Sequence, residues 1–242
     1  MILGLGIHPP AHIFNEINDA VCQMTNRLVV FNAHNFTPPK NSIVFNLENL
    51  TANPHLRTWP NHHEVWDFNR QNLPIYPPSV KLHHVPIGYH PSMERFKRSK
   101  ELDIDVVFCG SMNERRERLL NKLRGAGVKV KTIHVGPVGH ERNQIFSRAR
   151  LAINLHYYMN PNLFESVRVS HLIANRVPVI TEDSTTKEEE TWGLVGVPYE
   201  RMFDRIIQML SKSQQHLEEV AEIALENFKK VPFTLPTMNN TK

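Results

Sequence analysis

From residue 104 onward the chain alternates short apolar runs with amphipathic stretches, and this alternation constrains the fold more than any other sequence feature. Residues 104–109 (IDVVFC) form a buried-strand run, and the stretch that follows places Leu119, Leu120 and Leu123 at helical spacing before two glycines. The order then repeats, with strand-like runs at 128–135, 151–157 and 177–181, helical patterns at 140–150 and from 162, and a helical tail from about 200 to 230. Strands alternating with helices predict a parallel sheet with helices on both faces.

The first 95 residues are less regular but read in the same way. Strands are predicted at 1–8, 28–34 and 42–47, a helix at 13–24, and a final strand and turn at 81–91. Periodicity is weak between Pro54 and Pro91. We therefore predict an α/β protein with a compact N-terminal domain at residues 1–92 and a second domain at 93–242, whose last helix is free to pack back on the first domain.

Size and composition indicate a globular protein. The chain has 242 residues, of which 40% are hydrophobic, and this is enough to form a core. It contains no long uninterrupted apolar run, and its start lacks the features of a signal peptide, so we expect no membrane span and a cytoplasmic location. The two cysteines, Cys22 and Cys109, are far apart and predict no disulfide framework.

The net charge of +4 is unevenly distributed. Residues 96–150 hold 13 Lys and Arg against 6 Asp and Glu, whereas the flanking segments are neutral or acidic. Such a basic segment favours an anionic ligand, either a nucleoside diphosphate or a nucleic acid. The alternative is that the basic residues simply form the wet face of one helix: Arg115, Arg116, Arg118, Lys122 and Arg124.

Ligands of doubly wound sheets bind outside the carboxyl ends of the strands, so the residues after each predicted strand are candidates. Gly110 and Ser111 open a helix that carries Arg115, an arrangement that suits a phosphate. The chain has neither a dinucleotide fingerprint nor a Walker motif. The other strand-end candidates are Asn113, Val135, Gly136, His156, Tyr157, Glu182 and Asp183.

The segment NLFESVRVSHLIANRVPVITE, residues 162–182, puts polar residues at the start of a buried helix. Free helix N–H groups and the Ser166 hydroxyl could hold a phosphate, and Glu165 could accept hydrogen bonds from sugar hydroxyls. Arg168 could neutralise the phosphate or orient Glu165, and Phe164 adjoins the same turn. The alternative is that Glu165 only complements the helix dipole.

Three runs carry a family resemblance: DVVFCGSMNERRERLLNKL, ERNQIFSRARLAINLHYY and the 162–182 segment. Together they resemble the C-terminal half of bacterial and phage glycosyltransferases of the GT-B type, particularly the group related to the spore-maturation glycosyltransferases. The upstream pieces IVFNLENL, HHEVWDFNRQNL and KLHHVPIGYHP resemble the end of the N-terminal domain in that group. The resemblance implies two Rossmann-like domains with parallel sheets, of which the N-terminal one, on the acceptor side, is reduced.

The resemblance also implies roles for individual residues. Gly110 and Ser111 would lie against the donor diphosphate, Val135 and Gly136 near the base, and Glu165 on a sugar hydroxyl. Many retaining enzymes of this type carry two glutamates eight residues apart, and this chain has only Glu165 there. The donor side would comprise Gly110, Ser111, Arg115, Val135, Gly136, His156, Tyr157, Phe164, Glu165, Ser166 and Arg168.

Transfer to an acceptor hydroxyl with inversion needs a base, which in GT-B enzymes comes from the N-terminal domain. We favour His8, because Pro9 and Pro10 end the first predicted strand beside it, and we retain Asp67 as a second candidate. His12, His34, Glu48 and Trp66 are the candidate acceptor-side residues. Trp59, Trp66, Tyr76 and Tyr89 could line an acceptor groove or could instead be packing residues.

The 14 histidines do not predict a metal site. The pairs His62-His63 and His83-His84 are adjacent, so in an extended chain their side chains point to opposite faces. GT-B enzymes moreover hold their diphosphate without a bound metal, so we expect neither a metal nor a cofactor beyond the nucleotide sugar.

The sequence thus predicts a glycosyltransferase that uses a nucleoside-diphosphate sugar, with UDP as the expected nucleotide. The acceptor is a glycan, a small metabolite or a hydroxylated base in DNA. The alternative is a non-catalytic nucleotide- or sugar-binding subunit derived from such an enzyme. A flavodoxin-like regulator is disfavoured because the paired acidic residues after its first strand are missing.

Overall fold

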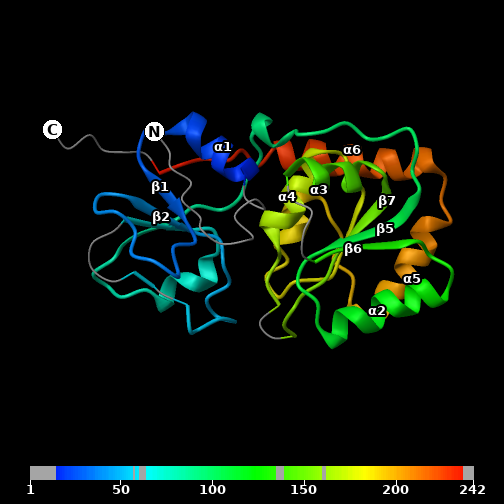
Figure 1. Ribbon diagram of the computed structural model, residues 1–242, viewed down its shortest axis with the longest axis horizontal. Coiled ribbons are helices and arrows are strands. Elements are labelled where there is room, and N and C mark those ends of the chain that lie inside the picture. Colours follow the sequence, from blue (N-terminus) through cyan, green and yellow to red (C-terminus); the bar gives the residue numbers. More distant parts are fainter. Residues whose placement is uncertain (1–14, 57, 60–63, 135–138, 160–161, 237–242) are drawn as a thin grey trace. The chain divides into compact units, whose positions relative to one another are not determined.

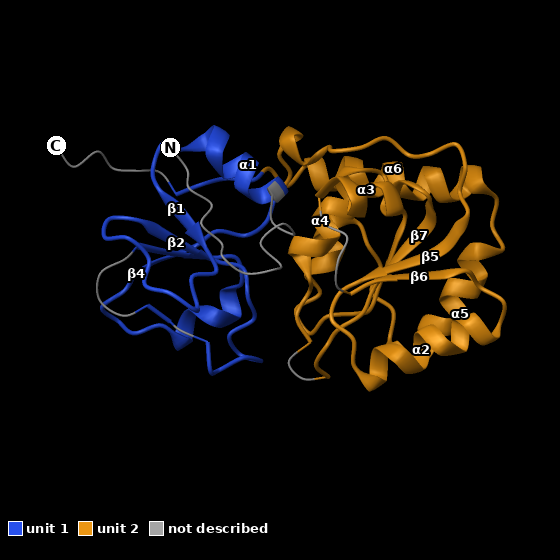
Figure 2. Ribbon diagram, viewed as in Figure 1, with its two compact units in different colours: residues 1–88, 233–242 blue, residues 89–232 orange. Residues whose placement is uncertain are grey.

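The computed structural model describes residues 15–56, 58–59, 64–134, 139–159 and 162–236. The chain divides into two compact units: unit 1 comprises residues 1–88 and 233–242, and unit 2 comprises residues 89–232 (Figure 2). Within the described residues, each unit is built on a four-stranded sheet in which all paired strands are parallel. The predicted α/β class with two parallel sheets is confirmed.

Unit 2 contains the alternation that the sequence predicts. Its strands are β5 (Ile104–Cys109), β6 (Val130–Ile133), β7 (Ala149–Asn154) and β8 (Val179–Thr181). Its α-helices are α2 (Glu114–Gly125), α3 (Gly139–Ser147), α4 (Ser166–Ala174), α5 (Tyr199–Leu210) and α6 (Gln214–Lys229). Two short 3₁₀ helices span Pro91–Met93 and Glu188–Trp192.

Strand β5 shows why this unit has helices on both faces. Val106 and Phe108 pack into one cluster with leucines of α2 and apolar residues of α5, whereas Val107 and Cys109 pack into a second cluster with residues of α3 and α4. Successive side chains of a strand point to opposite faces, so an apolar run such as IDVVFC needs cover on both sides. Figure 1 shows α2 and α5 on one side of the sheet and α3, α4 and α6 on the other.

The strand order of unit 2 creates a switch point. The order is β6-β5-β7-β8, so the chain leaves β5 toward β6 on one side and then crosses to β7 on the other. The loops after β5 and β7 therefore lead to helices on opposite faces of the sheet, and in doubly wound folds ligands bind where two such loops diverge. The carboxyl ends of β5 and β7 are the place where a ligand of this unit is expected.

The C-terminal tail differs from the single predicted helix. It forms α5 and α6, separated at Ser211–Ser213. The Ser213 side chain accepts a hydrogen bond from the His216 amide, which is the N-cap arrangement of a new helix. Serine and lysine at 211–213 interrupt the apolar periodicity, and this interruption was the available signal for the break.

Unit 1 contains α1 (Asn15–Met24), β1 (Val29–Phe31), β2 (Ile43–Asn46), β3 (Glu64–Asp67), a 3₁₀ helix (Arg70–Ile75) and β4 (Lys81–His84). The strands lie in sequence order β1-β2-β3-β4. Strand β3 was missed by the sequence analysis. It has only four residues and lies in the stretch where proline, histidine and aromatic residues obscure the periodicity. The predicted strand at 1–8 lies outside the described residues.

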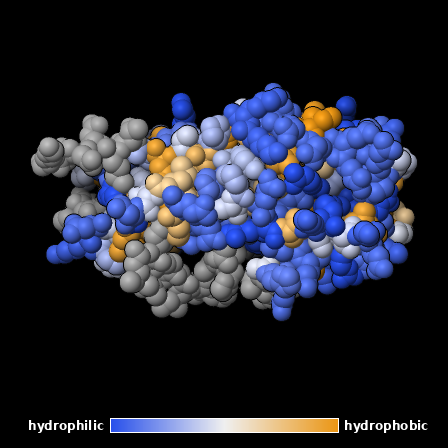
Figure 3. Space-filling view, turned by 90° about the horizontal axis from the view of Figure 1, so that it is seen from above, coloured by the Kyte–Doolittle hydropathy of each residue, from blue (hydrophilic) through white to orange (hydrophobic). Residues whose placement is uncertain are grey.

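One face of the molecule is mostly polar. Figure 3 shows one face on which hydrophilic colours predominate and apolar colour is confined to small separate patches. None of the helices in the described ranges combines the length and apolar character that a membrane crossing requires.

Asn175 fastens the segment that enters unit 2. It follows the last turn of α4 and is 1% exposed. Its Oδ1 accepts hydrogen bonds from the amides of Arg95 (2.5 Å) and Phe96 (2.9 Å), and its Nδ2 donates to the Met93 carbonyl (2.9 Å). One buried side chain therefore satisfies three main-chain groups of the segment that enters unit 2.

We expect Asn175→Ala to lower the free energy of unfolding by about 2–4 kcal/mol, because it leaves buried main-chain groups without partners. Urea denaturation measures the change. The matched control is Asn121→Ala, at an exposed position on α2, which should change stability by less than about 0.5 kcal/mol. Equal effects of the two variants would contradict this account of residue 175.

Candidate functional site

The loop after β5 allows a very close approach of two chain segments. Gly110 has a φ of +153°, and a Cβ added to it would lie 3.0 Å from Nη2 of Arg168. Glycine therefore lets the Arg168 guanidinium lie against the backbone of the β5–α2 loop. The predicted neighbours Gly110 and Arg168 are in contact.

The start of α2 offers free main-chain donors. Asn113 is the N-cap, and its side chain accepts a hydrogen bond from the Arg116 amide at 2.9 Å. Five consecutive amide N–H groups at this end find no acceptor in the described part of the chain, namely those of Ser111, Met112, Asn113, Glu114 and Arg115. Free amides at a helix N-terminus attract an anion.

Arg116 lies at the switch point. Its side chain is buried, with 1% of the residue exposed, and it donates to the Ser111 carbonyl at 2.6 Å and to the Leu155 carbonyl. These two carbonyls belong to the loops after β5 and β7, so one guanidinium joins the two loops. Its Nε–H finds no hydrogen-bond partner among the residues that the structure describes.

The charge of Arg116 is not neutralised by a direct ion pair, although Glu165 and Glu182 attract it from a distance. Among the described residues no carboxylate lies within ion-pair distance of it. Burial, and after it the nearby Arg168, lowers the pKa of Arg116 to about 10. Binding of an anion is favourable beside a buried cation that is repelled by a second cation.

Arg168 is held by two polar neighbours. Its Nη1 donates to Oδ1 of Asn154, the last residue of β7, at 2.8 Å. Its Nη2 lies 3.6 Å from a carboxylate oxygen of Glu165. Asn154 is itself fixed, because its Nδ2 donates to the Thr181 hydroxyl of β8 at 3.0 Å. The ends of β7 and β8 therefore orient this guanidinium.

Glu165 occupies a turn at the entrance to α4. Its φ of −78° and ψ of 57°, with the Ser166 amide donating to the Phe164 carbonyl at 2.8 Å, describe an inverse γ-turn. The Glu165 side chain makes no capping hydrogen bond and is 36% exposed. It remains accessible to a ligand while its backbone is fixed.

This turn corrects one expectation about α4. The amides of Ser166, Arg168 and Val169 already donate to carbonyls, whereas those of Phe164, Glu165 and Val167 have no acceptor among the described residues. The bonded Ser166 amide interrupts the row of free amides at the start of α4, so among the described residues the start of α2 offers the longer uninterrupted run. Ser166 itself is 6% exposed.

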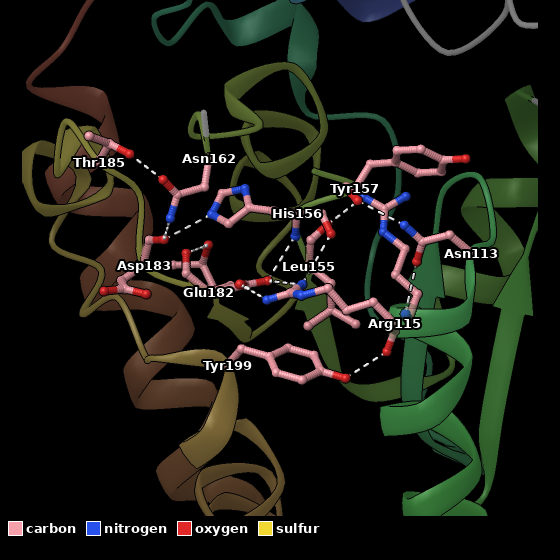
Figure 4. Close-up of polar contacts among 12 residues, drawn as sticks. Asn113, Arg115, Leu155, His156, Tyr157, Asn162, Glu182, Asp183, Thr185 and Tyr199 are labelled. Carbon is pink, nitrogen blue, oxygen red and sulfur yellow. Dashed lines mark hydrogen bonds and ion pairs between the residues drawn. The ribbon is translucent and has the colours of Figure 1, made fainter. Parts of the chain in front are cut away.

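Arg115, predicted to contact the donor, is already engaged (Figure 4). Both of its terminal nitrogens donate to the Glu182 carboxylate, one of them at 2.8 Å, and its guanidinium carbon lies 3.7 Å from the ring centroid of Tyr199. The Tyr199 hydroxyl donates to the Arg115 carbonyl at 2.6 Å. These contacts give Arg115 a structural role between α2, β8 and α5.

His156 is engaged in a similar way. It is 2% exposed, and its Nε2 lies 2.9 Å from the Asp183 carbonyl, so this nitrogen carries the proton. The Asn162 side chain donates to the same carbonyl at 3.1 Å, and the Thr185 hydroxyl donates to Asn162 (Figure 4). These bonds tie the loop after β7 to the loop after β8.

The remaining donor-side predictions divide into three groups. Phe164 is buried and packs edge-on against Trp192, with ring centroids 5.0 Å apart. Tyr157 is exposed at the rim, and Asn113 Nδ2 donates to its carbonyl at 2.8 Å. Val135 and Gly136 lie outside the described residues, as do His8 and His12 of the acceptor-side set.

Arg116 was not singled out from the sequence: it was grouped with the basic residues that either favour an anionic ligand or form the wet face of one helix. A signal was present, because Arg116, Leu119, Leu120 and Leu123 follow the i, i+3, i+4, i+7 spacing of one helix face. An arginine that continues the apolar stripe at the first turn is buried toward the strand ends.

Asp67, a predicted catalytic residue, is fully buried at the end of β3. Oδ2 accepts hydrogen bonds from Asn46 Nδ2 (2.7 Å) and the Tyr76 hydroxyl (2.7 Å), and Oδ1 accepts them from the Asn69 amide (2.8 Å) and Asn72 Nδ2 (3.0 Å). Burial raises the pKa of Asp67 to about 6, although these hydrogen bonds oppose the shift. The geometry describes a structural carboxyl group, with no face open to an acceptor.

The other acceptor-side candidates lie at different depths. Trp66 is 0% exposed and packs edge-on against Phe45, so its predicted place at an acceptor surface does not fit its position. His34 is half-buried, with Nε2 at 3.1 Å from Asn46 Oδ1. Its ring is tilted by 35° against that of Trp59, and the two centroids are 4.6 Å apart. Glu48 lies close by, with a carboxylate oxygen 3.4 Å from the Asn32 amide nitrogen.

Metal-ligating side chains do not gather in the described ranges: no group of three or more His, Cys, Asp or Glu residues there could hold an ion.

Comparison by sequence finds relatives but no assigned family. No family model matches the chain. Three uncharacterised proteins of Acanthamoeba polyphaga mimivirus are 26%, 27% and 26% identical to it over 75%, 93% and 90% of its length. The matches cover 63%, 29% and 26% of those proteins, so the chain spans less than two thirds of each relative.

Comparison by structure finds glycosyltransferases. The DNA-modifying enzyme β-glucosyltransferase, solved with and without uridine diphosphoglucose, gives a TM-score of 0.54 at 12% identity over 93% of this chain and 90% of that chain. T4 phage BGT in complex with UDP and Mn²⁺ gives 0.53 at 16% identity over 88% and 80%. AviGT4, a glycosyltransferase of avilamycin A biosynthesis, gives 0.50 at 10% identity over 92% and 90%. At these identities the likeness establishes the fold, and the chain has the two-unit, Rossmann-like GT-B fold.

The raised pKa of Asp67 makes a prediction about stability. Its folded-state pKa of about 6 lies above the usual 3.8, so its contribution to stability is present at low pH and is lost as the pH rises through about 6. The free energy of unfolding of the wild type, relative to Asp67→Asn, should therefore increase by about 1 kcal/mol between pH 7 and pH 5. Urea denaturation of both proteins at each pH measures it, and a pH-independent difference would refute the assignment.

Proposed function

We propose that the chain transfers a sugar from a nucleoside-diphosphate sugar to an acceptor hydroxyl. The GT-B fold supports this proposal, as do neighbours whose names include uridine diphosphoglucose and UDP. UDP is accordingly the nucleotide we propose. The similarity to the spore-maturation group and the division into an acceptor side, residues 1–92, and a donor side, residues 93–242, are parts of the same proposal.

The single observation that carries the proposal is the excess of positive potential at the switch point of unit 2. Arg116 is buried there and forms no ion pair with a carboxylate in the described ranges, and Arg168 lies beside it. The Ser111 and Met112 amides likewise have no acceptor in those ranges. Glu165 compensates only part of this charge, at 3.6 Å from Arg168. A diphosphate carries enough negative charge to balance both guanidinium groups.

This arrangement suits the departure of a diphosphate. As the glycosidic bond to phosphate breaks, negative charge grows on the leaving oxygen, and fixed N–H donors stabilise it without having to reorganise. Glu165 is exposed and can accept hydrogen bonds from hydroxyls of the sugar. His8 is our proposed proton acceptor for the acceptor hydroxyl, on the sequence argument alone.

Nucleotide binding is the first test. A panel of UDP, GDP, dTDP and CDP should include at least one that raises the melting temperature of the protein, because a ligand that binds only the folded state stabilises it by mass action. Arg116→Gln and Gly110→Ala should each lower the affinity for that nucleotide about 10- to 100-fold. Arg118→Gln, at a side chain 70% exposed on α2, is the matched control and should leave the affinity unchanged. A panel with no effect on the wild type would overturn the proposal.

Turnover is the second test. The protein should slowly hydrolyse one nucleotide sugar to free nucleoside diphosphate, and Glu165→Ala should reduce this rate at least about 100-fold. Glu117→Ala, at an exposed position of α2, should leave it unchanged. Tight nucleotide binding with no hydrolysis and no transfer would instead identify a non-catalytic binding subunit.

A further inference from the structure

The connection between β7 and α4 carries a cluster of exposed apolar side chains. Tyr157, Tyr158 and Met159, which we call the aromatic tip, are 36%, 37% and 78% exposed. Of the seven large hydrophobic residues exposed in the described part of the chain, these three are consecutive. The connection spans residues 155–165, whereas the one after β5 spans 110–113. Loops beyond about two to six residues at this edge of an α/β sheet commonly serve function.

The aromatic tip is held in place by its backbone. Asn113 Nδ2 donates to the Tyr157 carbonyl at 2.8 Å on one side (Figure 4). On the other side the Thr185 amide donates to the Asn162 carbonyl at 3.0 Å, and Asn162 Nδ2 donates to the Asp183 carbonyl at 3.1 Å. These bonds spare a ligand part of the entropic cost of ordering the loop.

The two rings form a corner with a cation behind it. The centroids of Tyr157 and Tyr158 are 4.8 Å apart and their planes are inclined by 68°. The guanidinium carbon of Arg116 lies 5.2 Å from the Tyr157 centroid. Since each tyrosine is more than a third exposed, the corner presents aromatic surface to solvent, beside a thioether that adapts easily to planar partners.

Two kinds of ring could occupy such a corner: a nucleobase or a sugar. A sugar needs several hydrogen-bonding groups beside the aromatic face for its hydroxyls, and the side chains of the aromatic tip supply only two phenols and a sulfur. A nucleobase needs mainly a π-face and nearby positive charge for its phosphates. The segment 96–150, which includes α2 and the N-cap Asn113 that holds the tip, carries 13 Lys and Arg against 6 Asp and Glu.

We propose that the aromatic tip stacks on a base of single-stranded or splayed-out nucleic acid. This inference rests on the proposed function in one respect: it names a polynucleotide as the acceptor of the sugar. Binding itself requires no donor, so it is measured separately from nucleotide binding and turnover.

The test is fluorescence anisotropy with a fluorescein-labelled oligothymidylate at low salt, in the absence of nucleotide sugar. Tyr157→Ala and Tyr158→Ala should each weaken binding about 5- to 100-fold, the loss expected when a base loses an aromatic partner. Tyr158→Phe should retain affinity, because it keeps the ring. Val195→Ala, at an apolar residue of unit 2 that is 77% exposed, is the matched control and should bind as the wild type does.

An abasic oligomer of the same length separates stacking from charge. The wild type should bind the abasic oligomer at least about fivefold more weakly than the oligothymidylate. The Tyr157→Ala protein should bind the two oligomers equally. Equal binding of the two oligomers by the wild type would overturn the inference, as would displacement of the probe by a neutral maltooligosaccharide. A failed nucleotide panel together with base-dependent oligomer binding would refute the proposed function and leave this surface assigned.

Discussion

The contact on which the candidate site depends is the pair of hydrogen bonds from Arg116 to the carbonyls of Ser111 and Leu155. In a parallel sheet with the order β6-β5-β7-β8, the loops after β5 and β7 lead to helices on opposite faces, and the two loops have to be held together. A buried guanidinium joins them with two donors. Burying this charge without a paired carboxylate is costly for folding, and a bound anion would offset that cost. The Arg116 side chain therefore both joins the two loops and supplies positive charge for the proposed chemistry.

The residues around Arg116 divide into those that hold the site and those that remain available. Arg115, His156 and Phe164 have their side chains in contacts within unit 2, with Glu182, Asp183 and Trp192 respectively. Glu165 and Tyr157 remain exposed on backbones that are fixed by a turn and by Asn113. The main chain of this site is fixed, while the Glu165 and Tyr157 side chains are accessible to a ligand. A fixed main chain limits the reorganisation needed when charge develops on a leaving group.

Unit 1 uses a different means of fixing its strand ends. Asparagine amides and one tyrosine hydroxyl surround the Asp67 carboxyl group, and every one of its polar neighbours comes from the ends of β2 and β3 or from the 3₁₀ helix that follows. Such a network is satisfied within itself and leaves the carboxyl group no free face. Stability of this unit should therefore respond to pH, while the proposed proton acceptor has to be sought elsewhere in the sequence.

The sequence predicted the order of elements in unit 2 because apolar runs such as IDVVFC and LAIN are buried on both faces and leave a pattern that needs no tertiary information. It also predicted that Gly110, Glu165 and Arg168 would be neighbours, since strand ends of a parallel sheet share one edge. It failed for β3, which is too short to show a period, and for the helix break at Ser211–Ser213. The burial of Trp66 and Asp67 could not be predicted from the sequence, because it depends on tertiary partners such as Phe45, Asn46 and Tyr76. The burial of Arg116 was signalled by its spacing with the leucines of α2. The two-domain GT-B fold is confirmed, and the link to the spore-maturation group stays a prediction.

The central claim is that the free amides at the start of α2, together with Arg116 and Arg168, hold a diphosphate. A crystal structure of the protein with bound UDP tests it most directly. The account predicts phosphate oxygens within hydrogen-bonding distance of the Ser111 or Met112 amide, with the Arg168 guanidinium turned toward them. A diphosphate bound elsewhere in unit 2, with these amides and Arg168 out of its reach, would contradict it.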